Sequence, residues 1–219
     1  MQRQPSPALE RAVWGGLLVI VFVIAGAYYR KATNGLRAPP ESLPVIAQVA
    51  DFHLTNQLGQ PVSMADLRGK VWVANIIFSR CPGPCAAMTR QMASLQSALT
   101  PGMPVRIVTL TTDPEHDTPA VLKDYAAKAG AREHHWWFVT GGKVPIAALA
   151  VDSLKLVSVE KAPAERTSAM DLFIHSTTCV LVDKRGRLRA SFETVGEGVD
   201  WTRTQQSILA AVRQLLDEK

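Results

Sequence analysis

The feature that most constrains the fold is a cysteine motif placed between an apolar run and a helical segment. Residues 71–78 are hydrophobic almost throughout, as expected of a central β-strand that is covered on both faces. Cys81-Pro82-Gly83-Pro84-Cys85 follows, and residues 86–99 have helical character. A thiol at such a junction lies near the free N–H groups and the positive dipole end of the helix, which lower its pKa. The junction therefore predicts an α/β domain with a reactive cysteine pair.

The spacing of this pair leaves several kinds of chemistry open. Three intervening residues put Cys81 and Cys85 one helical turn apart on one face, whereas thioredoxin-type oxidoreductases have two. A thiolate is both a nucleophile and a soft metal ligand, so the motif allows redox chemistry, metal binding or both. A structural disulfide is an alternative, although proline and glycine between the cysteines favour an exposed loop. A structural zinc site normally takes four protein ligands, and the chain has no second cysteine pair.

The rest of the chain alternates strand and helix patterns. This order, with a hairpin near the start of the domain and another near its end, predicts a mixed central sheet flanked by helices. Residues 159–173 are polar and are predicted to be irregular. The predicted strands are 52–55, 61–63, 71–78, 105–110, 136–139, 178–182 and 188–192. The predicted helices are a short one after Ser63, one over 86–99, one that begins at Thr118-Pro119, one over 145–151 and a last one capped by Asp200.

The N-terminal part predicts a membrane anchor. Residues 1–11 form a polar tail, and residues 12–29 are apolar and uncharged, which is just long enough for a membrane-spanning helix. Trp14 and Tyr28-Tyr29 suit the two interfaces, whereas Ala25-Gly26-Ala27 supports a cleaved signal peptide as the alternative. Residues 30–43 form a proline-containing linker, and residues 44–219 form the folded domain. We expect this domain to face the periplasm or another extracytoplasmic space.

The charge balance gives little reason to expect a nucleic-acid partner. The net charge is +5 and the pI is near 9.3, but no run of five or more Lys or Arg residues occurs. We interpret the charges as a solvated surface and predict no binding to nucleic acid.

Several motifs, taken in order, resemble one known family. The apolar run, the C-x3-C motif, the segment Asp113-Pro114-Glu115-His116-Asp117-Thr118-Pro119 and the triplet His175-Ser176-Thr177 resemble the Sco/SenC family over about residues 45–217. The resemblance implies a thioredoxin-like fold and a membrane-anchored copper protein that assists assembly of the copper site of cytochrome c oxidase. It also implies that Cys81, Cys85 and His175 bind copper. The implied partners are the copper-site subunit of the oxidase, other copper chaperones or thiol–disulfide reductases, and the membrane.

The residue chemistry agrees with a copper site and keeps a redox role open. Thiolates prefer Cu(I), and an imidazole accepts both Cu(I) and Cu(II). The same two sulfurs can form a disulfide, which abolishes the site. Gly83 and Pro84 stand where the family usually has an acid, and Ile174 replaces the usual Asp before the histidine.

These departures favour a second hypothesis, a thiol–disulfide oxidoreductase in which His175 is dispensable. We expect Arg80 to stabilise the Cys81 thiolate. A peroxiredoxin-like peroxidase is a third hypothesis, but Ser79-Arg80-Cys81 does not supply the threonine that such an active site needs.

Other candidate residues have structural interpretations. Asp113 and Asp117 could order the loop, but for Asp117 an Asx turn with a helix cap is the favoured interpretation. His134-His135 looks like a strand entry, and Met88 and Met92 are expected in the core rather than as thioether ligands. Cys179 lies in an apolar strand and is predicted to be an inert core thiol.

Overall fold

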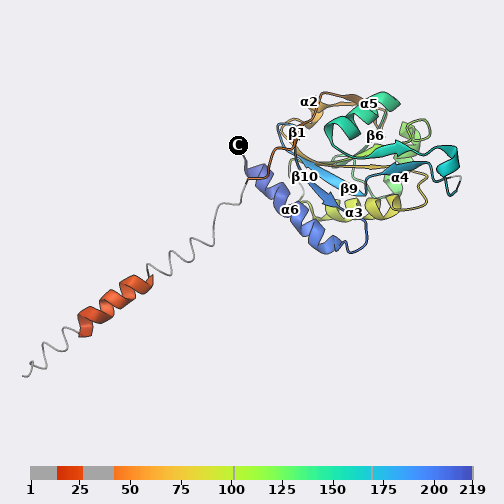
Figure 1. The fold of residues 1–219 in the computed structure, drawn as a ribbon. Helices are drawn as coiled ribbons and strands as arrows, with labels where there is room; N and C mark the ends of the chain where they lie inside the picture. The colour runs from red at the N-terminus through yellow and green to blue at the C-terminus, as the bar shows by residue number, and fades with distance from the viewer. Residues whose placement is uncertain (1–13, 27–41, 101, 169, 219) are drawn as a thin grey trace, which may run out of the picture. The chain divides into compact units, whose positions relative to one another are not determined.

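The computed structural model describes residues 14–26, 42–100, 102–168 and 170–218 (Figure 1). The chain divides into two units, Met1–Ser42 and Leu43–Lys219. In the first unit a helix covers residues 14–26. The ends of the predicted anchor, 12–13 and 27–29, lie outside the described residues, as do the polar tail and most of the linker. Within the described ranges, no helix combines the length and the apolar character needed to cross a membrane.

The second unit is built on one mixed sheet. Among the described residues eight strands form it, in the order β1-β10-β9-β4-β5-β6-β2-β3. β4, β5 and β6 are parallel, and the remaining neighbours pair antiparallel. The strands are β1 Ala47–Gln48, β2 His53–Asn56, β3 Pro61–Ser63, β4 Val71–Ile77, β5 Val105–Thr111, β6 Trp136–Thr140, β9 Thr178–Val182 and β10 Arg187–Glu193.

Helices cover both faces of this sheet (Figure 1). On one face α3, α4 and α6 pack their apolar stripes on Val71 and Val73 of β4; on the other, α2 and α5 pack with Trp72 and Ile76. Every residue of β4 is buried, because side chains alternate between two covered faces. The helices are α2 Met64–Leu67, α3 Cys85–Ala98, α4 Pro119–Lys128, α5 Lys143–Ala147 and α6 Trp201–Asp217.

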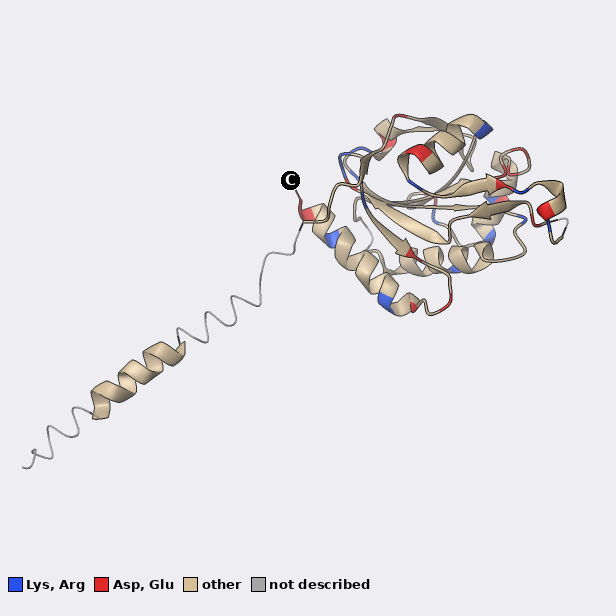
Figure 2. Ribbon diagram, in the orientation of Figure 1, with Lys and Arg blue, Asp and Glu red and all other residues tan. Residues whose placement is uncertain are grey.

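The predicted mixed α/β architecture and its first hairpin are confirmed. β2 and β3 pair antiparallel around a turn in which Gly59 has φ +76°, a conformation that glycine adopts without strain. Thr118 caps α4, and its hydroxyl accepts a hydrogen bond from the Val121 N–H at 3.4 Å. Acidic and basic positions are interspersed along the domain (Figure 2).

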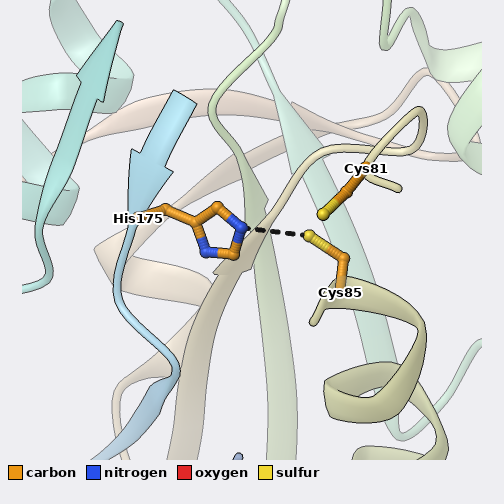
Figure 3. A group of neighbouring side chains, drawn as sticks. All are labelled: Cys81, Cys85 and His175. Carbon is orange, nitrogen blue, oxygen red and sulfur yellow. Dashed lines mark hydrogen bonds between the residues drawn. The ribbon is translucent and has the colours of Figure 1, made fainter. Parts of the chain in front are cut away.

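Two predictions need correction. The helix predicted over 145–151 begins at Lys143 and continues as a π-helix, η1 Ala148–Ser153, because its last turns widen. The segment 159–173 is not irregular throughout. β7 Ser158–Glu160 pairs antiparallel with β8 Phe173–His175, forming a two-stranded ribbon, and a short 3₁₀ turn, η2 Pro163–Glu165, lies in the loop between them. This ribbon carries His175 to the start of α3 (Figure 3).

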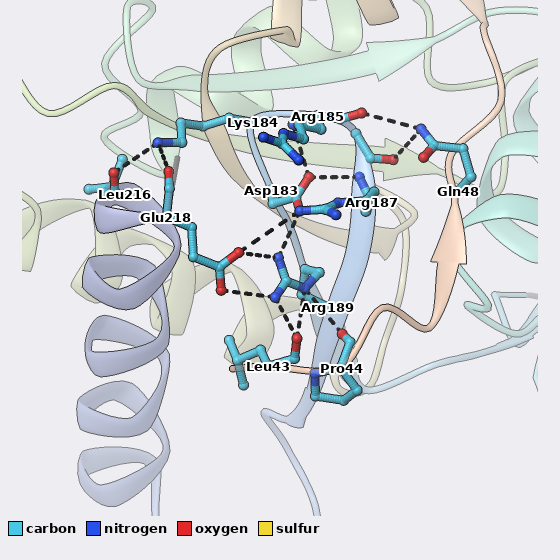
Figure 4. Close-up of polar contacts among 11 residues, drawn as sticks. Leu43, Pro44, Gln48, Asp183, Lys184, Arg185, Arg187, Arg189, Leu216 and Glu218 are labelled. Carbon is cyan, nitrogen blue, oxygen red and sulfur yellow. Dashed lines mark hydrogen bonds and ion pairs between the residues drawn. The ribbon is translucent and has the colours of Figure 1, made fainter. Parts of the chain in front are cut away.

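A buried ionic cluster holds the first residues of the second unit to its C-terminal helix (Figure 4). Arg189 is only 3% exposed, and its guanidinium donates to Asp183 at 2.8 Å and to Glu218 at 2.6 Å. It also donates to the backbone carbonyls of Leu43 and Pro44. The Arg189 hydrogen bond holds the pKa of Glu218 below its usual value. A buried arginine is tolerated here because two carboxylates and two carbonyls replace its water.

Candidate metal centre

The two motif cysteines occupy different environments at the end of β4. Cys81 lies in the turn that follows the strand, and its N–H donates to the Phe78 carbonyl at 3.1 Å. Cys85 is the first residue of α3 and is 1% exposed, whereas Cys81 is half-buried. Pro84 stands at the N-cap and makes no side-chain cap. One sulfur is therefore buried at a helix start and the other is accessible from outside.

His175 reaches the cysteines from the ribbon (Figure 3). Its ring packs edge-on against Phe78, with the ring centroids 5.7 Å apart. Its Nδ1 lies 3.0 Å from the Ser176 carbonyl oxygen, which can only accept, so Nδ1 carries a proton. In the neutral ring Nε2 then holds the lone pair, and it faces Cys85 Sγ at 3.1 Å. A backbone carbonyl thus orients the ring, the task expected of the aspartate that Ile174 replaces.

These three side chains form the one group of potential metal ligands among the described residues. The two sulfurs and one imidazole nitrogen all lie within 4.8 Å of one another. Three donors that lie in one plane, each about 2.3 Å from a shared ion, are about 4 Å apart. Each donor atom here therefore has to move by less than about 1 Å to reach a common ion. The structure therefore brings together the three predicted ligands.

The thiol pair is electronically asymmetric. The Cys81 sulfur accepts a hydrogen bond from the Cys85 side chain, which is the largest cause of a Cys81 pKa lowered to about 4. The Gly83 N–H, 3.4 Å from the sulfur, acts in the same direction. The same bond and burial raise the pKa of Cys85. The accessible Cys81 therefore has the lowered pKa and the buried Cys85 the raised one.

Asp117 has a different role from the one favoured by its sequence context. Thr118, not Asp117, caps α4, and the Asp117 carboxylate is fully buried. It accepts hydrogen bonds from the Ser79 N–H at 3.0 Å, from the Ser79 hydroxyl and from the Thr111 hydroxyl at 2.5 Å. Asp117 therefore anchors the chain two residues before Cys81, so the interpretation as a turn and cap residue was wrong.

Arg80 pairs with the other acid of the segment that follows β5. Its guanidinium lies 2.5 Å from the buried carboxylate of Asp113, and it is not among the causes of the Cys81 pKa shift. The stabilisation of the Cys81 thiolate by Arg80 stays a prediction, and the partner that the structure gives the guanidinium is Asp113. Asp113 and Asp117 together hold residues 79 and 80, so both acids order the cysteine loop.

The remaining candidates lie apart from the centre. Met88 and Met92 are completely buried, and Cys179 is buried in β9, where desolvation raises its pKa to about 12. His134-His135 directly precede β6 and belong to no group of potential metal ligands in the described part of the chain. The core assignments of the methionines and of Cys179 are confirmed.

The centre opens into a cavity of about 200 Å³ whose rim the sequence did not reveal. It is lined by Cys81, His175 and Ile174, and by the ion pair between Lys161 and Asp171, whose charged atoms lie 2.7 Å apart. That pair closes the loop between β7 and β8. The alternation of Val157 and Val159 with polar residues was a strand signal that could have revealed the ribbon.

Comparison with known proteins places this geometry in one family. The family model SCO1/SenC matches residues 42–215. A SCO1 protein homolog of Bacillus subtilis is 34% identical over 154 residues, which is 69% of this chain and 77% of the relative.

Two solved structures share the fold. One is BsSco, a member of the Sco family of cytochrome c oxidase assembly proteins with an identified disulfide switch. It is 30% identical, with a TM-score of 0.67, over 82% of this chain and all of that one. The other, Bradyrhizobium japonicum ScoI with copper bound, is 23% identical with a TM-score of 0.63, over 78% of this chain and all of that one; at this identity the likeness bears on the fold alone. By the extent of the family match and the identity to the Bacillus relative, the chain belongs to the SCO1/SenC family.

Proposed function

We propose that this chain binds copper through Cys81, Cys85 and His175, and that it assists assembly of the copper site of a cytochrome c oxidase. The observation that carries the proposal is the convergence of two sulfurs and one oriented imidazole nitrogen within 4.8 Å. Thiolates select Cu(I), and an imidazole is a ligand for both copper oxidation states. A structural zinc site would normally have a fourth protein ligand, and no further Cys, His, Asp or Glu joins this group in the described residues.

The donor set suits a protein that passes its metal on. Three ligands leave one side of an ion open toward the cavity, where Cys81 is accessible and Cys85 is not. A receiving thiolate could approach there and replace Cys81 first. The role in oxidase assembly is supported by membership of the family and by the likeness to BsSco.

A second function, thiol–disulfide exchange, is favoured by the asymmetry of the pair. The Cys81 thiolate would attack a client disulfide to give a mixed disulfide and release one client thiolate. The Cys85 thiol would then give its proton to the released client thiolate and attack the Cys81 sulfur, which breaks the mixed disulfide and releases the second client thiolate. The client gains two electrons, and the protein ends with a Cys81–Cys85 disulfide. In this reaction His175 is not required.

The two functions are separated by a Cu(I) titration of the reduced protein against a competing chelator. Copper binding predicts one Cu(I) per chain and a loss of at least tenfold in affinity for His175→Ala. His134→Ala is the matched control, because His134 is exposed at the opposite end of the parallel strands. Equal affinities of wild type and His175→Ala would contradict the three-ligand site, and no tight binding by either would leave thiol–disulfide exchange.

We also propose that residues 12–29 anchor the chain in a membrane and that the domain faces the extracytoplasmic side. The proposal rests on the uncharged apolar run and its aromatic ends. Extraction of cell membranes with alkaline carbonate tests it: an anchored chain stays in the pellet, and a chain released into the supernatant contradicts the anchor. Protease added to intact spheroplasts should digest the domain.

A further inference from the structure

We propose that the outer face of the β7–β8 ribbon docks the protein that receives the metal, and that this partner presents aliphatic side chains beside its own cysteines. The ribbon face consists of Val157, Val159 and Ile174. The inference rests on the proposed function, because it identifies the surface that brings a client to the same centre.

Strand pairing places these residues together. Val159 and Ile174 are directly opposite one another in the ribbon, and Val157 lies two residues before Val159 on the same face. Phe173 and His175 alternate with Ile174 and point to the other face, where both rings pack against Phe78. The ribbon therefore holds a metal ligand on one face and an aliphatic surface on the other.

All three side chains of the ribbon face are exposed. Val157, Val159 and Ile174 are 50%, 54% and 53% exposed. Four of the eight exposed large hydrophobic residues described between residues 42 and 218 lie in the segment 157–174, and the fourth of these is Met170. Single exposed apolar residues are ordinary, but contiguous ones mark interaction sites.

The ribbon face is continuous with the metal centre. Ile174 lines the cavity that also contains Cys81 and His175. At the other end of the face, the Val157 N–H donates to the Ser176 hydroxyl at 2.7 Å, and the carbonyl of Ser176 orients the His175 ring. A partner that covers Ile174 therefore lies at the cavity that Cys81 also lines.

The size and the charge of the surface indicate the kind of partner. Three half-exposed aliphatic side chains offer on the order of 300 Å², well below the roughly 800 Å² that each partner contributes to a stable interface. This favours a transient client over a second copy of the chain. The nearby charged side chains already have partners: Glu160 pairs with Lys143 and Arg166, and Lys161 pairs with Asp171. A partner protein would therefore contact the ribbon face with aliphatic side chains.

Two fluorescein-labelled peptides test the proposal with the metal-free, reduced full-length protein in detergent. Both contain the same pair of cysteines, flanked by valine and isoleucine in one peptide and by serine in the other. Fluorescence anisotropy should show about tenfold tighter binding of the aliphatic peptide. The double variant Val159→Ser/Ile174→Ser should bind both peptides equally, while Val151→Ser, an exposed valine in η1, keeps the preference.

Each outcome has one meaning for the proposal. A preference that survives in the double variant, or that is absent from the wild type, would overturn it. Dimerisation in sedimentation velocity that the double variant abolishes would assign the face to a second copy instead. Val159→Ser alone, at a position outside the cavity lining, should weaken the peptide preference and leave the Cu(I) titration as in the wild type; an unchanged preference in this variant would also overturn the proposal.

Failure of the proposed function is seen separately, because the peptide titration uses no metal. A wild type that binds the aliphatic peptide but not Cu(I) would keep the docking surface and remove the copper function. A wild type that binds Cu(I) and shows no peptide preference would keep the copper function and remove the docking surface.

Discussion

Replacing Asp117 by Asn should loosen the cysteine loop without changing the size of the side chain. Asp117 is fully buried and accepts three hydrogen bonds, two from Ser79 and one from Thr111. An asparagine has one acceptor oxygen, and its NH2 group can only donate. One of the two hydroxyl groups must therefore accept a hydrogen bond from the NH2 group instead of donating one. The two other bonds change from charge-assisted to neutral, each weaker by about 1 kcal/mol. We expect the free energy of unfolding to fall by about 2 kcal/mol.

Urea denaturation followed by tryptophan fluorescence measures this change. Asp124→Asn, at an exposed position of α4, is the matched control and should stay within about 0.5 kcal/mol of the wild type. Because Ser79 begins the loop that places Cys81, the pKa of Cys81 should also rise, as judged from the pH dependence of its alkylation by iodoacetamide. If Asp117→Asn matches Asp124→Asn in both measurements, the anchoring role of Asp117 is wrong.

Three further predictions concern the thiols and the buried arginine. The alkylation rate of Cys81 should be nearly constant from pH 6 to 9 and should fall only near pH 4, since its thiolate persists above a pKa of about 4; an inflection near the ordinary value of about 8.5 would contradict the hydrogen bond from Cys85. Cys179→Ala should leave the Cu(I) stoichiometry unchanged and cost about 1 kcal/mol of stability, whereas loss of bound copper would show that the core thiol is a ligand. Arg189→Ala should destabilise the protein by about 2–3 kcal/mol, because Asp183 and Glu218 each lose a charge-assisted hydrogen bond while Arg187 stays 2.7 Å from Asp183; Arg213→Ala, at an exposed position of α6, is the control, and similar urea midpoints for the two variants would refute this reasoning (Figure 4).

The sequence was informative where a residue pattern determines local structure directly. The apolar run of β4 has one arrangement that buries both of its faces, and Thr118-Pro119 begins α4 because a hydroxyl caps the helix and proline fits its first turn. The three predicted ligands come from β8, from the turn after β4 and from the first residue of α3, and their proximity followed from a family resemblance rather than from spacing.

What the sequence did not predict depends on contacts distant along the chain. Asp117 reads locally as a turn residue, but its partner Ser79 is 38 positions away. The ribbon escaped notice because each strand has three residues, too few for a clear period of two. Arg189 lies in a predicted strand, and its partner Glu218 is 29 positions away.

X-ray absorption at the copper edge of the Cu(I)-loaded protein tests the central claim most directly. The account predicts a first coordination shell of two sulfurs and one imidazole nitrogen, and the loss of the nitrogen contribution in His175→Ala. A shell with three sulfurs, or with none, would contradict a centre formed by Cys81, Cys85 and His175.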